Sequence, residues 1–401
     1  MENLLEKARQ LSILKTSQKL PSYKRFLYRK IKNSNSKIIG IYGARGVGKT
    51  TLILQILKNL NLPVKESLYI SCDHPIFTDI NLFDFLEYFY KKGGKIIFID
   101  EIHKIKDFQK HLKSAYDFLG IRIIFTGSSA ISLTEPDFTR RFSMYKLPIF
   151  SFKEYIELSY GIKLKSFTLE EIIKNHELVS QEIITILKDK RILSLFEEYN
   201  KHGCYPFYFE DKAKFLDRLQ DTVNAILYYD MAEMFKISSD KIHTLKKLLA
   251  TICASKPMEF SIDKLTNITG ISKATFYKYI DYLSRGELLI HIMHEAKRFK
   301  PIRKPDKLYL SNPNLLNALC LSPDKGTLRE TFFVSMLNFQ HRLFYTDKGD
   351  FMVDEKYIFE IGGKNKDFSQ IKNIKNSFLA VDDIEIGFER KIPLWLFGFL
   401  Y

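Results

Sequence analysis

The sequence predicts an α/β protein of several domains, whose N-terminal part is a parallel sheet with helices on both faces. Three short apolar runs predict buried strands of that sheet, at residues 37–42, 95–99 and 121–125. The first run is followed by a glycine-rich loop and by a pattern with one apolar helical face, at residues 51–60. Because strands that alternate with helices form parallel sheets, we expect a doubly wound core. With 401 residues, the chain is long enough for about two to four domains.

The loop after the first predicted strand has the spacing G-x-x-x-x-G-K-T. Its glycines let successive backbone N–H groups converge on phosphate, and the following helix presents its positive N-terminal end to the same anion. We expect Lys49 to reach the β- and γ-phosphates of ATP and the Thr50 hydroxyl to bind Mg²⁺. The predicted ATP-binding residues are Gly43, Ala44, Arg45, Gly46, Val47, Gly48, Lys49, Thr50 and Thr51.

Two carboxylates lie at the C-terminal end of the second predicted strand. Asp100 is placed to hold Mg²⁺ through water, and Glu101 is placed to polarise the water that attacks the γ-phosphate. An acidic strand end that caps the next helix is the plain alternative. Because the loop and the two carboxylates occur in the expected order, ATP hydrolysis is the main functional prediction for this part of the chain.

Polar residues that complete such a site follow the third predicted strand. Ser128 is our choice for the side chain that senses the γ-phosphate, with Thr126 and Ser129 beside it, although hydroxyl residues at strand ends are also ordinary turn residues. An arginine further along, Arg140 or Arg141, is placed either to reach the nucleotide of a neighbouring subunit or to pair with a surface carboxylate. Both interpretations of the arginines stay open.

These motifs resemble the AAA-type ATPases that are common in archaea and some bacteria. Members of that family join a P-loop ATPase to a winged helix and to a C-terminal domain of the restriction-endonuclease-like type. The resemblance spans nearly the whole chain and implies the same order of domains here. The similar segments are residues 42–51, 98–105, 126–129, 140–142, 151–155 and 391–397.

The composition is typical of a globular protein of the cytoplasm. Hydrophobic residues make up 45% of the chain and charged residues 27%, as in folded rather than disordered proteins. The sequence has neither a run of about eighteen apolar residues nor the apolar segment of a signal peptide, so we expect no membrane span and no secretion. Because the cysteines lack CxxC spacing, we expect reduced thiols and no zinc site. They are Cys72, Cys204, Cys253 and Cys320.

We divide the chain into four predicted domains. Residues 1–152 hold N-terminal helices and the ATPase core, and residues 153–237 form a helical lid with a helix start at residues 168–171. A winged helix follows at residues 238–322, and a C-terminal α/β domain at residues 323–401. The formal net charge of +15 favours an anionic partner, usually nucleic acid, although a lysine-rich proteome is an alternative explanation.

The predicted winged helix has three helices and two strands, at residues 239–254, 261–269, 272–285, 288–293 and 307–310. Ser272 is a natural N-cap of the third helix, whose one face buries Phe276, Ile280 and Leu283. We expect the opposite face and the basic wing to contact duplex DNA, mainly at phosphates, with packing against proteins as the alternative. The predicted DNA-binding residues are Lys273, Tyr277, Lys278, Lys297, Arg298, Lys300, Arg303 and Lys304.

The C-terminal domain carries a pattern similar to that of metal-dependent nucleases. Asp350 starts one predicted strand, Glu360 ends the next, Lys364 lies nearby, and Glu330 lies on the preceding helix. In such sites carboxylates hold Mg²⁺ and a lysine assists the attack of water on a phosphodiester. The pattern usually has its lysine two residues after the glutamate, where this chain has Gly362. We therefore expect a domain that retains DNA binding or docking without cleavage, with active cleavage as the alternative.

Together, these motifs predict an ATPase. We expect it to couple hydrolysis to the binding or remodelling of duplex DNA or of branched DNA such as a Holliday junction. We expect ATP and Mg²⁺ as cofactors. We also expect a homo-oligomer, with a hexameric ring as one form, because an arginine supplied in trans needs a neighbour. Two alternatives stay open, an ATP-dependent signalling or defence switch and an ATP-regulated, metal-dependent nuclease.

Overall fold

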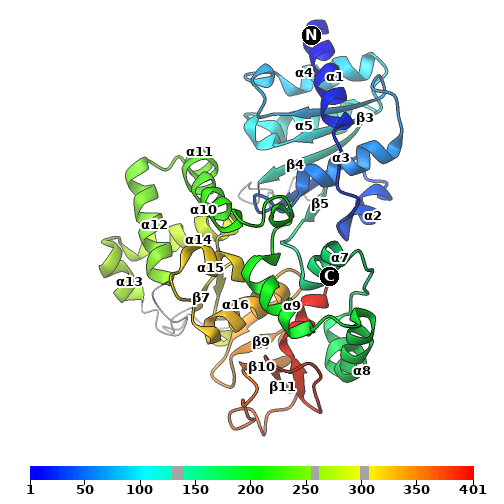
Figure 1. Cartoon of the computed structure of the whole chain (residues 1–401). Helices are drawn as coiled ribbons and strands as arrows, with labels where there is room; N and C mark the ends of the chain where they lie inside the picture. Colours follow the sequence, from blue (N-terminus) through cyan, green and yellow to red (C-terminus); the bar gives the residue numbers. More distant parts are fainter. Residues whose placement is uncertain (129–139, 254–261, 299–306) are drawn as a thin grey trace. The chain divides into compact units, whose positions relative to one another are not determined.

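The chain folds into two compact units, Met1–Pro148 and Ile149–Tyr401. The computed structural model describes residues 1–128, 140–253, 262–298 and 307–401, and Figure 1 traces them from the N-terminus to the C-terminus. Each unit contains a five-stranded sheet with helices, so the predicted α/β class is confirmed. No helix among the described residues is long and apolar enough to cross a membrane.

The sheet of the first unit is parallel and has the strand order β2-β3-β4-β1-β5. Its strands are β1 (Ile38–Gly43), β2 (Ser67–Ser71), β3 (Ile96–Asp100), β4 (Arg122–Ser128) and β5 (Ser143–Lys146). Every residue of β3 is buried, because consecutive apolar side chains face the helices on both sides. In the register of β1 with β4, Gly43 lies opposite Ser128, so the carboxyl ends of these strands meet at one edge of the sheet.

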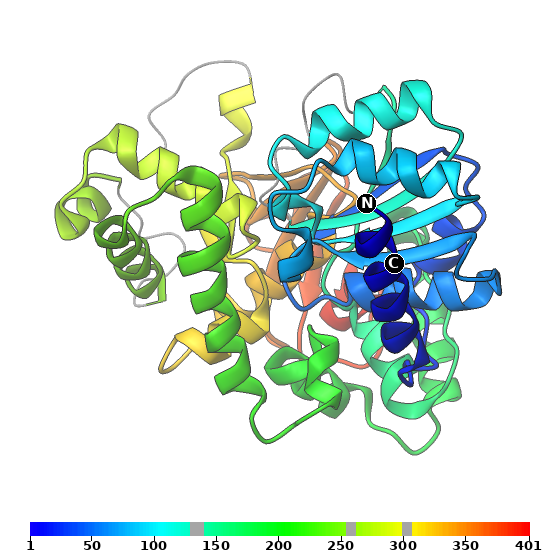
Figure 2. The same ribbon diagram turned by 90° about the horizontal axis from the view of Figure 1, so that it is seen from above.

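Helices cover both faces of this sheet, as Figures 1 and 2 show from two directions. One face carries α3 (Lys49–Leu60), and the other carries α4 (Leu82–Lys91) and α5 (Phe108–Phe118) side by side. The predicted apolar face of α3 is buried at Leu52 and Ile56. The doubly wound core predicted from the sequence is therefore confirmed.

The N-terminal helices pack against the core of the first unit. Helix α1 (Glu2–Ser17) runs along the edge strand β2, where the Ser12 hydroxyl accepts a hydrogen bond from the Tyr69 backbone N–H at 3.0 Å. An edge strand covered in this way does not pair with other chains. Helix α2 (Leu27–Lys32) packs on α3, and two short 3-10 helices, η1 (Pro75–Phe77) and η2 (Ile102–Lys104), follow β2 and β3.

The second unit begins with helices. They are α7 (Phe152–Tyr160), α8 (Leu169–Leu187), α9 (Ile192–Glu198), η3 (Tyr199–Gly203), η4 (Pro206–Phe209), α10 (Phe215–Ala225), η5 (Ile226–Met231) and α11 (Ala232–Phe235). Thr168 and Glu171 form a capping box at the start of α8, which confirms the helix start predicted there.

These helices pack against the end of the chain. The Ser151 hydroxyl donates to the Tyr401 carbonyl at 3.0 Å, and the rings of Phe152 and Phe399 lie edge to face at 5.9 Å. The helices that we expected to form a lid thus share a compact unit with the C-terminal residues. The division into four domains stays a prediction.

Three helices and a two-stranded antiparallel sheet come next. They are α12 (Ser239–Cys253), α13 (Ile262–Thr269), α14 (Lys273–Arg285), β6 (Leu289–Ile292) and β7 (Lys307–Leu310), with η7 (Glu295–Arg298) after β6. Ser272 caps α14 by accepting from the Thr275 N–H at 3.2 Å, and Gly270 makes the preceding turn with φ 69°. These positions agree closely with the predicted elements, whereas the assignment as a winged helix stays a prediction.

The C-terminal sheet has the order β12-β11-β10-β9-β8. Strands β10, β11 and β12 are parallel, and β8, β9 and β10 are antiparallel. Aromatic rings of Phe333, Phe359 and Phe397 pack together between the sheet and its helices. The elements are α15 (Pro313–Leu319), α16 (Lys325–Leu337), β8 (Leu343–Tyr345), β9 (Phe351–Val353), β10 (Tyr357–Gly362), β11 (Ser377–Val381), β12 (Lys391–Pro393) and η8 (Leu394–Phe399).

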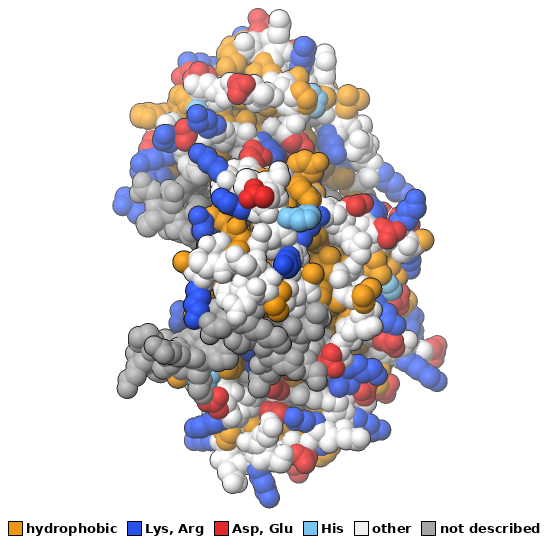
Figure 3. All heavy atoms as spheres, turned by 90° about the vertical axis from the view of Figure 1, so that its left-hand side faces the viewer, with side chains coloured by type: hydrophobic (Ala, Val, Ile, Leu, Met, Phe, Trp, Pro, Cys, Tyr) orange, Lys and Arg blue, Asp and Glu red, His pale blue; other side chains and the backbone are white. Residues whose placement is uncertain are grey.

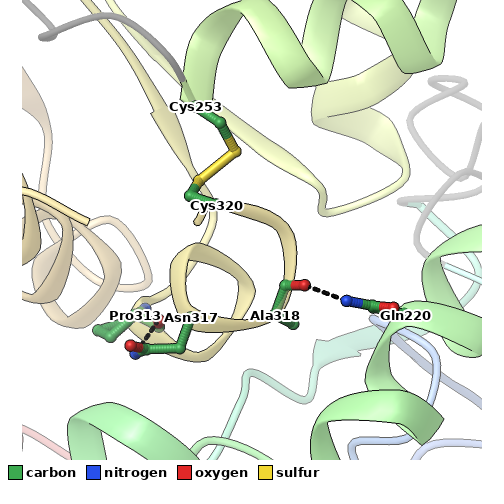
Figure 4. Close-up of a disulfide and its surroundings, with 6 residues drawn as sticks. All are labelled: Gln220, Cys253, Pro313, Asn317, Ala318 and Cys320. Atoms are coloured by element: carbon green, nitrogen blue, oxygen red, sulfur yellow. Dashed lines mark hydrogen bonds between the residues drawn. A yellow bond between two sulfur atoms is a disulfide. The ribbon is translucent and has the colours of Figure 1, made fainter. Parts of the chain in front are cut away.

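Cys253 and Cys320 form a disulfide bond, which corrects the prediction of four reduced thiols (Figure 4). Cys253 ends α12 and Cys320 directly follows α15, and their Cα atoms lie 5.1 Å apart. The two cysteines are 67 residues apart in sequence, so their spacing gave no sign that these helix ends meet. Cys72 and Cys204 are buried free thiols, as predicted. The cytoplasmic location stays a prediction.

Hydrogen bonds hold the end of α15 that carries Cys320 (Figure 4). The Asn317 side chain donates to the Pro313 carbonyl at 2.9 Å within the helix. The Gln220 side chain, on α10, donates to the Ala318 carbonyl. The disulfide therefore joins α12 to a helix that is already fixed against α10.

Basic and acidic side chains are interspersed on the face of the molecule that Figure 3 shows. On this face the Lys and Arg side chains lie at scattered positions and are not gathered in one block.

Candidate active site

The glycine-rich loop lies between β1 and α3 and has the geometry of a phosphate cradle. Gly46 and Gly48 have φ 85° and 95°, in the left-handed region where glycine is favoured. A Cβ on Gly43 would lie 2.2 Å from the Leu147 carbonyl oxygen, so only glycine fits there. The buried ammonium group of Lys49 donates to the Gly43 and Ala44 carbonyls, at 2.9 Å each. The loop thus curls around the side chain that we expect to bind phosphate.

Asp100 lies beside this loop and is held by hydroxyl groups. The Thr50 hydroxyl donates to Oδ2 of Asp100 at 2.8 Å, and the Tyr69 hydroxyl donates to the same oxygen at 2.9 Å. The Thr126 hydroxyl donates to Oδ1. These groups come from α3, β2 and β4, because the carboxyl ends of neighbouring parallel strands meet at this edge of the sheet.

The pair Thr50 and Asp100 suits Mg²⁺, which prefers carboxylate and hydroxyl oxygens. Asp100 is only 3% exposed. Burial and the charge of Asp100 raise the pKa of Tyr69 well above its ordinary value, so the phenol stays protonated and remains a donor. The residues present therefore fit the predicted metal, with Tyr69 fixing the orientation of the carboxylate.

Glu101 follows Asp100 in a left-handed backbone conformation, with φ 52°. Its N–H donates to the Thr126 hydroxyl at 3.2 Å, which fixes the turn after β3. Oε2 of Glu101 lies 3.4 Å from Nδ1 of His103, but the geometry does not make a hydrogen bond, and among the described residues this nitrogen has no hydrogen-bond partner. The glutamate side chain is 32% exposed, as a group that meets a water molecule must be.

Burial, followed by the charges of Lys104, Lys49 and Arg45, lowers the pKa of His103 to about 3. The imidazole next to Glu101 is therefore neutral at physiological pH. A neutral imidazole does not form an ion pair with Glu101, although Nδ1 of His103 lies 3.4 Å from its carboxylate.

The other residues predicted for this site are the hydroxyl residues after β4 and the two arginines. Ser128 is the last residue of β4, whereas Thr126, two residues earlier, is the hydroxyl that contacts Asp100. Arg141 lies 3.5 Å from Asp117 of α5, which is the surface pairing left open by the sequence, and Arg140 is exposed. Ser129 lies outside the described residues.

The predicted DNA-binding residues are partly described. Lys273, Tyr277 and Lys278 are exposed on α14, and the opposite face buries the three predicted apolar side chains. Of the wing residues, Lys297 and Arg298 end η7. The others, Lys300, Arg303 and Lys304, lie outside the described residues.

The C-terminal carboxylates form a second cluster with a different lysine from the one predicted. Nζ of Lys366 lies 2.5 Å from Oε1 of the buried Glu360, whereas Lys364 is exposed. An ideal Cβ on Gly362 would lie 2.6 Å from the Lys366 side chain. Lys366 thus fills the space that a side chain at position 362 would take, and the assignment of Lys364 is corrected.

Strand β7 contributes a lysine and a tyrosine to the same cluster. Nζ of Lys307 lies 3.7 Å from Oε2 of Glu330 and 3.9 Å from Oδ1 of Asp350. The Tyr309 hydroxyl donates to Oε2 of Glu330 at 2.5 Å. Burial and the charge of Asp350 raise the pKa of Glu360, and burial raises the pKa of Glu330 although Lys307 opposes the shift.

Three residues of these sites were missed at the sequence level. Tyr69 lies on a strand that we did not predict, although Leu68 to Ile70 is a short apolar run that signals one. Lys307 is the first residue of a predicted strand and has no other sequence signal. Lys366 lies after a glycine pair, where the direction of the chain does not follow from a strand pattern.

Comparison with known proteins finds two family models and one relative that are similar to parts of this chain. Residues 35–156 match a family model described as an AAA domain, and residues 193–325 match one described as a domain of unknown function. An uncharacterized protein of Methanocaldococcus jannaschii is 32% identical over an alignment of 292 residues that covers 69% of this chain and 61% of that protein. The chain thus spans less than two thirds of the length of this relative.

Similar solved structures include a Walker-type ATPase of Pyrococcus abyssi, with 13% identity, a TM-score of 0.41 and coverage of 73% of this chain and 94% of that one. A RuvB variant of Thermotoga maritima has 17% identity, a TM-score of 0.27 and coverage of 71% and 88%. AMPPCP-bound DnaA from Aquifex aeolicus has 16% identity, a TM-score of 0.23 and coverage of 64% and 84%. The family match and the parallel sheet support an AAA-type P-loop ATPase domain at residues 35–156.

Proposed function

We propose that this chain hydrolyses ATP with Mg²⁺ and couples hydrolysis to the binding or remodelling of duplex or branched DNA. The AAA domain at residues 35–156 supports the first part of the proposal. The loop N–H groups and Lys49 hold the phosphates, Thr50 and Asp100 hold Mg²⁺, and Glu101 polarises the attacking water.

The contact between Thr50 and Asp100 carries this proposal. The two residues are 50 positions apart in sequence, yet Oγ1 and Oδ2 lie 2.8 Å apart. A glycine-rich loop by itself accounts only for the binding of an anion. A hydroxyl and a carboxylate that meet beside the loop supply the oxygens for Mg²⁺, which neutralises charge as the γ-phosphoryl group is transferred.

The exposed face of α14 supports the second part of the proposal. Lys273, Tyr277 and Lys278 are exposed on one side of a helix whose other side is buried. Such a helix, with an antiparallel pair of strands after it, suits insertion into a DNA groove. With a net charge of +15, the chain attracts DNA by releasing its counterions.

An oligomer is part of the proposal, because Arg140 is exposed near the end of the first unit, whereas Arg141 lies beside Asp117. A neighbouring copy that receives this guanidinium at its nucleotide would complete its site in trans. We propose Arg140 as that residue, and a ring of identical subunits, such as a hexamer, as the assembly.

The proposal is tested by ATP turnover without DNA and with linear duplex, single-stranded and four-way-junction DNA. We expect Mg²⁺-dependent turnover that Lys49→Ala abolishes, and stimulation by duplex or branched DNA. Turnover without any DNA binding or stimulation would favour a signalling or defence switch. Selective stimulation by the junction would identify branched DNA as the substrate.

The DNA-binding face is tested by the double variant of Lys273→Ala and Lys278→Ala. We expect weaker binding to all sequences and a salt dependence that is shallower by about one phosphate contact for each lysine removed. The matched control replaces the exposed Lys174 of α8 and Lys188, which follows it, by alanine. Equal affinity in the test and control variants would exclude α14 as the DNA-binding helix.

A metal-dependent nuclease is the second candidate function. The observation that favours it is the cluster of Glu330, Asp350 and Glu360 with a lysine, Lys366, at 2.5 Å from Glu360. Carboxylates and a lysine that lie close together are the groups that metal-assisted hydrolysis of a phosphodiester uses. Against it, within the described residues no three carboxylate, histidine or cysteine side chains are grouped closely enough to hold a metal ion.

Incubation of supercoiled and junction DNA with the protein and Mg²⁺ or Mn²⁺ decides whether this cluster cleaves DNA. If the cluster cleaves DNA, Glu360→Gln and Lys366→Met will abolish cleavage and leave ATP turnover unchanged. Intact DNA after incubation with the wild-type protein, with ATP and either metal, would exclude the nuclease.

A further inference from the structure

We infer that Arg25 is a positioning residue of the ATP site and braces the phosphate-binding loop from outside, an inference that rests on the proposed ATPase function. Arg25 lies just before α2 and is 6% exposed. Nη1 donates to the Val47 carbonyl at 2.7 Å, and Nη2 donates to the Pro148 carbonyl at 2.8 Å. Val47 belongs to the glycine-rich loop, and Pro148 is the last residue of the first unit.

The bond to Val47 determines how one peptide group of the loop is turned. The Val47 carbonyl and the Gly48 N–H belong to the same planar trans peptide, in which they point in opposite directions. Because Arg25 holds the carbonyl, the Gly48 N–H points away from Arg25. Backbone N–H groups of this kind of loop cradle the phosphates, and Gly48 also precedes the first residue of α3. Arg25 thus aims a phosphate-binding group without touching the nucleotide itself.

The bond to Pro148 ties the loop to the segment that lies against its start. The Leu147 N–H donates to the Tyr42 carbonyl at 2.7 Å. The Leu147 carbonyl fills the space where Gly43 would carry a Cβ. Arg25 therefore joins the end of the loop, at Val47, to the segment that packs on its beginning, and a change in the loop on ATP binding would reach Pro148 through one side chain.

Arg25 is itself held in place by α3. The Gln55 amide of that helix donates to the Pro21 and Tyr23 carbonyls, at 2.8 Å each, and this side chain is buried as well. The backbone that carries Arg25 is thus fixed on the helix that begins with Lys49. The planar guanidinium of Arg25 directs two separate nitrogens at two carbonyls, whereas a lysine has a single nitrogen and no rigid fork.

The test compares Arg25→Ala and Arg25→Lys with the control variant Lys58→Ala. Lys58 donates to the Gln18 carbonyl at 3.1 Å, so it ties the same N-terminal segment to α3 without touching the loop. Loss of a charge-assisted hydrogen bond should raise the KM for ATP by about tenfold in Arg25→Ala and by roughly threefold in Arg25→Lys. We expect kcat to stay within about twofold, and Lys58→Ala to match the wild type.

Two readouts separate positioning from a general loss of stability. Added guanidinium ion should restore ATP binding to Arg25→Ala and leave the wild type unchanged. The rise in melting temperature that Mg-ATP produces should shrink in Arg25→Ala, whatever the melting temperature without ATP. If Arg25→Ala does not fold, Arg25→Lys decides the question.

A folded Arg25 variant with the wild-type KM would overturn the role of Arg25 and leave the proposed function standing. Wild-type protein that neither binds nor hydrolyses ATP would instead refute the proposed function. The two failures are therefore distinguishable within one set of measurements.

Discussion

The two carboxylate sites of this protein surround their acidic groups with different kinds of donor. In the first unit, hydroxyl groups of Thr50, Tyr69 and Thr126 donate to the buried Asp100. A hydroxyl orients a carboxylate and satisfies its lone pairs, but it does not cancel its charge. The charge of Asp100 therefore stays available to a cation brought in with the nucleotide.

In the second unit, ammonium groups lie beside the carboxylates, in addition to the Tyr309 hydroxyl that donates to Glu330. Lys307 lies between Glu330 and Asp350, and Lys366 lies against Glu360. A buried charge is costly unless it is paired, and here the chain supplies the partners itself. The comparison teaches that the second unit supplies cations to its own carboxylates, whereas the groups that hold Asp100 are neutral hydroxyls.

The largest expected effect comes from removing one carboxylate of each site. Asp100→Asn should lower Mg²⁺-dependent ATP turnover on the order of a hundredfold or more, because the metal loses its charged ligand. The matched change Asp350→Asn, in the second unit, should leave ATP turnover within about twofold. Steady-state turnover at saturating Mg²⁺ measures both. A similar loss in both variants would break the distinction between the sites.

The disulfide should stabilise the second unit alone. Cys253 and Cys320 close a loop of 67 residues, for which the loss of chain entropy predicts about 4 kcal/mol of unfolding free energy. Reduction should lower that energy and leave the KM for ATP unchanged. Trp395, the only tryptophan of the chain, is buried in this unit and reports its unfolding in urea by fluorescence.

The control for this measurement replaces both cysteines by serine. In that variant dithiothreitol should have no effect on the urea midpoint. If reduction leaves the wild-type midpoint unchanged as well, the disulfide does not contribute to stability in solution.

A smaller loss of stability should follow when a lysine of the cluster in the second unit is replaced. Lys307→Met leaves Glu330 and Asp350 without a nearby ammonium group from β7, and we expect a loss of about 3 kcal/mol in the unfolding free energy reported by Trp395. Glu330→Gln in the same protein should recover part of the loss. Lys325→Met, at an exposed position of the same unit, is the matched control. No difference between the two lysine variants would show that the cluster does not depend on its own cations.

In the first unit the elements predicted from the sequence agree closely with the structure, because each is indicated by a pattern of neighbouring residues. The glycine-rich loop, α3 and the strand that ends at Asp100 each occupy a few consecutive residues. Contacts that join distant segments could not be found in this way. Tyr69 reaches Asp100 from a strand with a weak apolar signal, and Arg25 reaches Val47 from a segment without a motif.

In the second unit, patterns of neighbouring residues again located the helices and strands. They did not predict which distant residues these elements contact. The cap at Ser272 and the turn at Gly270 placed α14 nearly to the residue. The nuclease-like pattern led to Lys364, because spacing along a strand says nothing about a chain that turns back over Gly362 to bring Lys366 to Glu360. The pairing of Cys253 with Cys320 likewise depends on packing alone.

The smallest effect concerns pH, and it should have opposite signs in the two units. Burial lowers the pKa of His103 to about 3, from an ordinary value of 6.5. Between these values the unfolded chain binds more protons than the folded one, so the first unit should lose stability as pH falls below 6.5. We expect a loss of about 2 kcal/mol at pH 5. Protection of β3 amides against hydrogen exchange measures it, and His103→Gln should reduce the loss.

The carboxylates of the second unit reverse this dependence. Burial and Asp350 raise the pKa of Glu360 above its ordinary value of 4.5, so the folded unit binds more protons than the unfolded chain just above that pH. The contribution of Glu360 to stability is then complete below pH 4.5 and is lost as pH rises through the raised pKa. Protection of β10 amides should therefore fall with rising pH in this range, and Glu360→Gln should remove the trend. The same sign of pH dependence in β3 and β10 would show that hydroxyl and ammonium surroundings do not distinguish the two sites.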